Sequence, residues 1–196
     1  PMFEQNKRIY IYQTNLELEF FQNKVFSFTL DDYTLTNKEI IIEDIPGAPW
    51  HDGGRISFGP DEKLYITTGD AVNPGWSQDL TSLAGKILRI NSDGTIPDDN
   101  PFDSSAIFSY GHRNPQGIAW NEDGMLVSSE HGPSGEMGYG HDEINVIVKG
   151  KNYGWPKVVG DSSDDSFVNP IIHSGEQTWA PSGMVYYSSD KISSLE

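Results

Sequence analysis

"RISFGPDEKLYITTGD" (residues 55–70) aligns without a gap onto "GIAWNEDGMLVSSEHG" (residues 117–132), which begins 62 positions later. Each segment has a short apolar run, a turn rich in Gly, Pro, Asp and Asn, and a second run, which is typical of a strand–turn–strand hairpin. Because the hairpin recurs, we interpret it as part of a repeating unit of about 60 residues.

Further traces of the unit occur on both sides of these hairpins. "PQGIAW" (residues 115–120) recurs as "PSGMVYY" (residues 181–187), and "EQNKRIYIYQT" (residues 4–14) resembles the second half of the unit. No stretch has apolar residues at helical spacing for more than two turns, and residues 77–86 are expected to form a loop with at most one helical turn. Alternating or continuous apolar runs predict strands at residues 8–14, 24–30, 39–45, 55–58, 63–70, 86–90, 117–120, 125–130 and 144–148.

The repeat favours an all-β fold of the β-propeller type. Propeller blades are four-stranded antiparallel sheets, and about 4 to 8 of them close a ring. A chain of 196 residues supplies little more than three such blades, and an open arc leaves two apolar blade faces uncovered. We therefore predict one partial propeller domain over residues 1–196, with N-terminal and C-terminal blades missing. Completion by another chain and a non-propeller sandwich are the alternatives.

The composition narrows the possible partners. Lys and Arg total 13 against 29 Asp and Glu, and the net charge of −16 disfavours nucleic acid as a partner. The carboxylates could bind hard divalent cations or form only a solvated surface. The absence of cysteine excludes disulfides and cysteine-bound zinc. No apolar run approaches the roughly 18 residues of a membrane span, and the first residues do not resemble a signal peptide.

Polar residues flank the first hairpin on both sides. In an antiparallel hairpin, the residues before the first strand and after the second meet at the same open end. "HDGGR" (residues 51–55) and "TTGDA" (residues 67–71) should therefore bring His51 close to Asp70. A histidine held by a carboxylate can act as a general base near neutral pH. A structural hydrogen bond at the blade edge explains the pair equally well.

The second hairpin has a different set of residues at the same end. "GHRNP" (residues 111–115) and "SEHGP" (residues 129–133) should bring Arg113 and Asn114 close to Gly132 and Pro133. Arg113 and Asn114 could hold a carboxylate-bearing ligand, or Arg113 could bind carboxylates of its own blade. The carbonyl groups of Gly132 and Pro133 could ligate a hard cation such as calcium, or the segment could be only a turn.

"GHDEIN" (residues 140–145) and "GKNYGWP" (residues 150–156) add Glu143, Tyr153 and Trp155. Glu143 could bind a metal ion, although a capping or solvated carboxylate is the common alternative. The other histidines show no zinc-binding spacing, and we interpret them as surface residues or as supports of the site; they are His112, His131, His141 and His173.

Six segments together resemble the soluble PQQ-dependent glucose and aldose sugar dehydrogenases of the glucose/sorbosone dehydrogenase family. They are "HDGGRISFGPDEKLYITTGDA" (51–71), "LAGKILRINSDGTIPDDNPF" (83–102), "SYGHRNPQGIAW" (109–120), "SSEHGP" (128–133), "DEINVIVKGKNYGWP" (142–156) and "WAPSGMVYY" (179–187). The resemblance extends from about residue 1 to residue 187.

The resemblance implies a six-bladed propeller that holds PQQ over a calcium ion. It implies a quinoprotein that oxidises the anomeric hydroxyl of aldose sugars to lactones and passes electrons to an external acceptor. Position by position, it implies His51 as general base, Asp70 as its orienting partner, and Arg113 and Asn114 as quinone-binding residues. A periplasmic or secreted location is also implied.

The implied metal sites come from the later motifs. Gly132 and Pro133 match the residues that ligate the cofactor's calcium through backbone carbonyls, and Glu143 and Tyr153 match residues that bind a second, structural calcium. Two local departures affect this interpretation. The link "SGEMGYGHDE" (residues 134–143) is longer than usual, so the calcium neighbourhood could be rearranged, and Trp50 precedes the base where polar residues can contact the sugar.

Two other functions remain open from the sequence, and so does the way in which a site would be completed. A calcium-dependent propeller hydrolase of the lactonase type would also use a histidine base, but it has no need for the Arg113 and Asn114 pair. A non-catalytic propeller binding module would keep the motifs for blade geometry alone. The later blades, with further basic cofactor ligands, are missing, so this fragment alone could be inactive, and self-association could complete the propeller.

Overall fold

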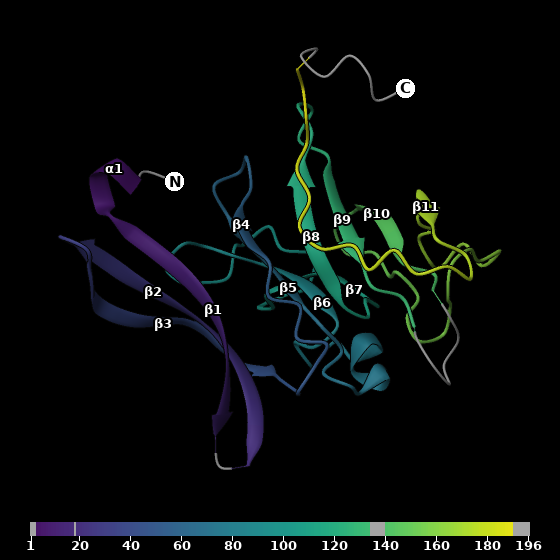
Figure 1. Cartoon of the computed structure of the whole chain (residues 1–196), viewed down its shortest axis with the longest axis horizontal. Helices are drawn as coiled ribbons and strands as arrows, with labels where there is room; N and C mark the ends of the chain where they lie inside the picture. Colours follow the sequence, from purple (N-terminus) through teal and green to yellow (C-terminus); the bar gives the residue numbers. More distant parts are fainter. Residues whose placement is uncertain (1–2, 18, 134–139, 190–196) are drawn as a thin grey trace.

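A computed structural model describes residues 3–17, 19–133 and 140–189. Three antiparallel sheets follow one another along the chain, coloured purple, teal and green in Figure 1. The first has the order β1-β2-β3 and contains β1 (Arg8–Glu17), β2 (Phe20–Asp31) and β3 (Thr34–Pro46). A short helix, α1 (Phe3–Asn6), precedes it.

The second and third sheets have four strands each. The second, in the order β4-β5-β6-β7, contains β4 (Ile56–Phe58), β5 (Leu64–Thr68), β6 (Lys86–Ile90) and β7 (Ile107–Tyr110). The third, in the order β11-β10-β9-β8, contains β8 (Pro115–Trp120), β9 (Leu126–Glu130), β10 (Glu143–Ile147) and β11 (Ile172–His173). Strands that follow in sequence pair with each other, which is the topology of a propeller blade.

The sequence repeat corresponds to equivalent hairpins. Ile56 pairs with Ile66 in the β4–β5 hairpin, and Ile118 pairs with Ser128 at the same register in the β8–β9 hairpin. The predicted all-β architecture and the division into about three blades are therefore confirmed.

Two apolar layers hold the sheets together. Ile66 and Leu88 belong to a cluster with Val25 of the first sheet, whereas Tyr65 and Ile87 pack with the third sheet. Successive side chains of a strand point to opposite faces, so the second sheet contributes to both layers. All residues of β5 and β6 are buried for this reason, including the polar side chains of Thr67, Thr68, Lys86 and Arg89.

All the predicted strands are present, and the structure adds β7 and β11, which were not predicted. The 3₁₀ helix η1 (Pro74–Gln78) overlaps the start of the predicted loop, and its proline lies at the favoured first position.

Residues 181–187, which repeat the β8 sequence, form no strand. Their yellow trace runs alongside β8 in Figure 1. The carbonyl of Ser182 accepts a hydrogen bond from Oγ of Ser129, a residue of β9, at 2.7 Å. No helix in the described parts of the chain is long and apolar enough to cross a bilayer.

Candidate functional site

His51 and Asp70 meet at the open end of the β4–β5 hairpin, as predicted. His51 lies in the loop before β4, Asp70 follows β5, and 2.9 Å separate His51 Nδ1 from Asp70 Oδ1. The close approach needs glycine at position 69, because a Cβ there would overlap the carbonyl oxygen of His51. The two residues thus form a histidine–carboxylate pair of the kind used in proton transfer.

Asp70 is fixed by donors from two directions and is only 1% exposed. Its Oδ2 accepts a hydrogen bond from Trp155 Nε1 at 2.9 Å, and its Oδ1 accepts one from the Val72 amide at 3.0 Å. Because Trp155 follows β10 in the chain, the third sheet helps to orient the carboxylate beside His51.

The Arg113 guanidinium joins the two hairpins and is largely buried, with 9% exposure. Its Nη2 lies 2.9 Å from His51 Nε2, its Nη1 donates to the carbonyl of His131 at 3.2 Å, and it lies 5.5 Å from the centre of the Trp155 indole. Burial lowers the pKa of Arg113, while the charges of Asp70 and neighbouring carboxylates act in the opposite direction.

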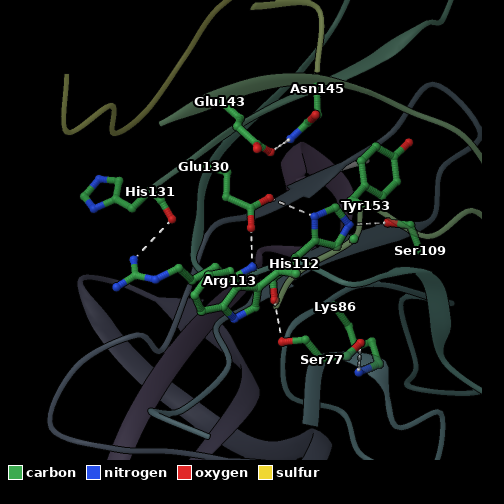
Figure 2. Close-up of polar contacts among 12 residues, drawn as sticks. Ser77, Lys86, Ser109, His112, Arg113, Glu130, His131, Glu143, Asn145 and Tyr153 are labelled. Atoms are coloured by element: carbon green, nitrogen blue, oxygen red, sulfur yellow. Dashed lines mark hydrogen bonds and ion pairs between the residues drawn. The ribbon is translucent and has the colours of Figure 1, made fainter. Parts of the chain in front are cut away.

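Arg113 forms no ion pair with a carboxylate among the described residues. Glu130, which lies on its own blade, accepts a hydrogen bond from the Arg113 backbone amide and not from the guanidinium (Figure 2). A buried cation without a carboxylate partner is a suitable group for binding an anion.

Asn114 also connects the hairpins. Its Oδ1 accepts hydrogen bonds from the Gly53 amide and from Gln116 Nε2, both at 3.1 Å, and its carbonyl accepts one from the His131 amide at 3.2 Å. The side-chain oxygen therefore has a structural role, which leaves the amide nitrogen as the group that could contact a ligand.

Gly132 and Pro133 follow β9 at the same end of the third sheet. The Gly132 amide donates to Asp142 Oδ1 at 2.8 Å. A Cβ at position 132 would overlap the carbonyl oxygens of Gly140 and His141. Backbone carbonyls therefore crowd this point, which suits a hard cation. Residues 134–139, most of the long link after "HGP", lie outside the described residues.

Glu130 is a site residue that the sequence reasoning missed. It is 4% exposed, and its Oε2 lies 2.9 Å from His112 Nδ1, whose ring also lies 2.8 Å from Ser109 Oγ through Nε2 (Figure 2). His112 is fully buried and stacks on Tyr153, so it supports the site and is not a surface residue. The signal was present, because Glu130 shares the inward face of β9 with Leu126 and Ser128.

Glu143 lies directly opposite Glu130 in the β9–β10 register. Burial, followed by the negative charge of Glu130, raises the pKa of Glu143 to about 8. Hydrogen bonds from Asn145 Nδ2 at 3.1 Å and from the Gly160 amide at 3.2 Å oppose this rise. Two like charges placed opposite each other favour a bound cation or a shared proton.

The Tyr153 hydroxyl is not free to act as a ligand beside Glu143. It donates to the Val146 carbonyl at 2.6 Å and accepts from the Val148 amide at 2.8 Å. Only the main-chain carbonyl of Tyr153 is left for a metal ion. The described parts of the chain hold no cluster of three or more His, Asp or Glu side chains suited to a metal, so a calcium ion here would need carbonyl ligands.

One small cavity of about 10 Å³ connects the residues of the second hairpin with the carboxylates. Its walls include Arg113, Glu130, Gly132, Pro133, Glu143 and Tyr153. The structure thus brings most predicted residues of the third sheet to one place. His51 and Asp70 do not line this cavity. They form hydrogen bonds with two residues that do, because His51 contacts Arg113 and Asp70 contacts Trp155.

The sequence profile of the family described as "Glucose / Sorbosone dehydrogenase" matches residues 1–196. Quinoprotein glucose dehydrogenase B of Acinetobacter calcoaceticus is 38% identical over 164 residues, which cover 72% of this chain and 33% of that protein. Aldose sugar dehydrogenase YliI of Escherichia coli is 43% identical over 160 residues, which cover 72% of this chain and 42% of that protein.

Solved structures agree with the sequence matches. The PQQ-bound form of aldose sugar dehydrogenase from Streptomyces coelicolor superposes with a TM-score of 0.87 at 37% identity, covering 95% of this chain and 55% of that one. The apo form of the soluble aldose sugar dehydrogenase from Escherichia coli gives a TM-score of 0.86 at 33% identity, covering 98% and 61%. The chain therefore spans between a third and three fifths of these relatives.

Proposed function

Because the chain belongs to the glucose/sorbosone dehydrogenase family, we propose that it is part of a quinoprotein that oxidises the anomeric hydroxyl of aldose sugars to lactones, with PQQ and calcium as cofactors. The observation that carries the proposal is the His51–Asp70 pair joined to the buried Arg113 guanidinium. The chain covers 55% of the PQQ-bound relative, so we propose the activity for a complete ring of blades.

The residues present fit such a cofactor. The Arg113 guanidinium has no carboxylate partner among the described residues, and carbonyl oxygens converge at Gly132, as an anionic quinone and a hard cation would require. When bound, PQQ would supply the two-electron acceptor for the sugar, and calcium would polarise it. Arg113 and the Asn114 amide would hold the quinone, while the carbonyls of Gly132 and Pro133 would hold its calcium.

His51 is the base in this mechanism. Its Nε2 takes the proton of the anomeric hydroxyl, while Asp70 holds Nδ1 and stabilises the imidazolium that forms. Glu143 and the main-chain carbonyl of Tyr153 would bind the second calcium, away from the base.

Titration with PQQ and calcium, followed by an aldose and a dye acceptor, tests this function. We would compare the chain alone with the chain fused to the remaining blades of the Escherichia coli relative. The fusion should reduce the dye when glucose or another aldose is added, and His51→Ala should lower kcat by at least about 100-fold because general-base catalysis is lost. A matched change at an exposed position, Lys157→Ala, should have no effect.

Dye reduction that survives His51→Ala would contradict the assignment of the base. Lactone hydrolysis without PQQ would favour the lactonase alternative. If the fusion does not bind PQQ and hydrolyses no lactone, the non-catalytic binding module would be favoured. Activity of the chain alone would indicate that self-association completes the site. We further propose a periplasmic or secreted location and an external electron acceptor, in keeping with the family.

A further inference from the structure

The contact between Arg113 and His51 determines which ring nitrogen of His51 carries the hydrogen. Arg113 Nη2 lies 2.9 Å from His51 Nε2, and a guanidinium can only donate. His51 Nε2 must therefore be the unprotonated acceptor. On the other side of the ring, Nδ1 lies 2.9 Å from the acceptor oxygen Oδ1 of Asp70, so Nδ1 carries the hydrogen. Both neighbours specify the same tautomer.

The same contact covers the lone pair that the proposed reaction needs. A base accepts a hydroxyl proton through its unprotonated nitrogen, and in this structure that nitrogen already accepts a hydrogen bond from Arg113. The side chain of His51 is still 21% exposed, so its access is limited by this hydrogen bond and not by complete burial.

Among the described residues, the guanidinium has only neutral partners to hold it over His51. Besides His51 Nε2, they are the His131 carbonyl at 3.2 Å and the face of Trp155 at 5.5 Å. A carboxylate binds a guanidinium more strongly than a carbonyl or a neutral imidazole does. An anionic ligand at this place would therefore compete successfully for Arg113.

We propose that Arg113 is a positioning residue that fixes the His51 tautomer and masks Nε2 until an anionic ligand draws the guanidinium away. This inference rests on the proposed function, because it concerns the same base. The tests below use the chain without PQQ. If the chain fails to bind PQQ in the separate titration, the proposed function is contradicted, but the masking of His51 Nε2 can still be measured.

The first measurement needs no variant. Long-range ¹H–¹⁵N correlation spectra of the histidine-labelled chain, recorded above neutral pH, report which ring nitrogen is protonated. We expect His51 to have the hydrogen on Nδ1 alone, with Nε2 as an acceptor. A hydrogen on Nε2, or the averaged tautomers of a free imidazole, would overturn the inference.

The second measurement is the rate of acylation of His51 Nε2 by diethyl pyrocarbonate, mapped by mass spectrometry. Arg113→Met keeps a long side chain but removes the donors, and we expect acylation to become about tenfold faster because a charge-assisted hydrogen bond is lost. Arg113→Lys keeps a donor and should stay within about twofold of the wild type. Arg55→Met, at an exposed arginine that does not contact His51, is the matched control. Equal rates for the Met and Lys variants at position 113 would show that packing and not hydrogen bonding limits access, which would contradict the masking.

Discussion

Glu130 and Glu143 are two acidic residues that lie close together in the site without a guanidinium between them. They lie opposite each other on β9 and β10, and the Arg113 guanidinium contacts neither of them. Glu130 accepts from the Arg113 amide and pairs with His112 at 2.9 Å, whereas Glu143 accepts the longer hydrogen bonds of 3.1 and 3.2 Å from Asn145 and Gly160, so Glu143 is held less tightly. A divalent cation beside Glu143 would remove the repulsion between the two charges.

We therefore expect calcium to stabilise the chain through Glu143. At 100 times its Kd, a single bound ion adds about 2.7 kcal/mol to the free energy of unfolding, which corresponds to a rise of roughly 5–10 °C in Tm. Glu143→Gln should lose most of that rise in a thermal melt followed by circular dichroism. Glu176→Gln, at an exposed position, should retain it. The same calcium-dependent rise in both variants would contradict a site at Glu143.

At the scale of secondary-structure elements, Lys86 attaches η1 to the start of β6. The side chain is fully buried, and its ammonium group donates to the carbonyls of Trp76, Ser77 and Ala84 at 2.7, 3.2 and 2.6 Å. Figure 2 shows Lys86 beside Ser77. Ser77 in turn donates from Oγ to the carbonyl of His112 at 2.6 Å. The lysine thus fixes the loop that supports the entry of the second hairpin.

Replacing this lysine should reduce stability and change its pH dependence. Lys86→Met leaves three carbonyls without a donor, and we expect the free energy of unfolding to fall by about 2–4 kcal/mol at neutral pH. Burial lowers the pKa of Lys86 from 10.5 to about 7. Between these values the unfolded chain binds more protons than the folded one, so wild-type stability receives a contribution that rises with pH from about 7 to about 10.5.

Urea unfolding across this pH range measures both effects. The free energy of unfolding of the wild type should rise relative to that of Lys86→Met as the pH increases from about 7 to about 10.5. The variant has no titrating group at this position, so it lacks this contribution. Lys157→Met, at an exposed lysine, should follow the wild type. Parallel profiles for the wild type and Lys86→Met would contradict the lowered pKa.

At the scale of the whole molecule, the sequence repeat and the strand pattern predicted the fold well. The 62-residue spacing reappears as the shared register of Ile56 with Ile66 and of Ile118 with Ser128. The β7 strand "IFSY" was missed because its four residues give too short a pattern to recognise. Residues 181–187 form no strand because no neighbour in the described chain completes a hairpin with them.

The candidate site was predicted in part for a related reason. The hairpin rule brings His51 to Asp70, since the two residues belong to one hairpin. The Arg113–His51 and Trp155–Asp70 contacts connect different sheets. They depend on how the blades pack, which local sequence patterns do not encode. Glu130 could have been found from the alternation of β9, which places it on the inward face with Leu126 and Ser128, although its residue type alone gave no signal.

Binding of PQQ in the presence of calcium would show whether residues of this chain hold an anionic quinone. We would follow the absorbance of PQQ during titration of the fused chain, in the wild type, Arg113→Met and Arg55→Met. We expect calcium-dependent, stoichiometric binding that Arg113→Met weakens by at least about tenfold and Arg55→Met leaves unchanged. Equal affinities of the wild type and Arg113→Met would contradict this expectation.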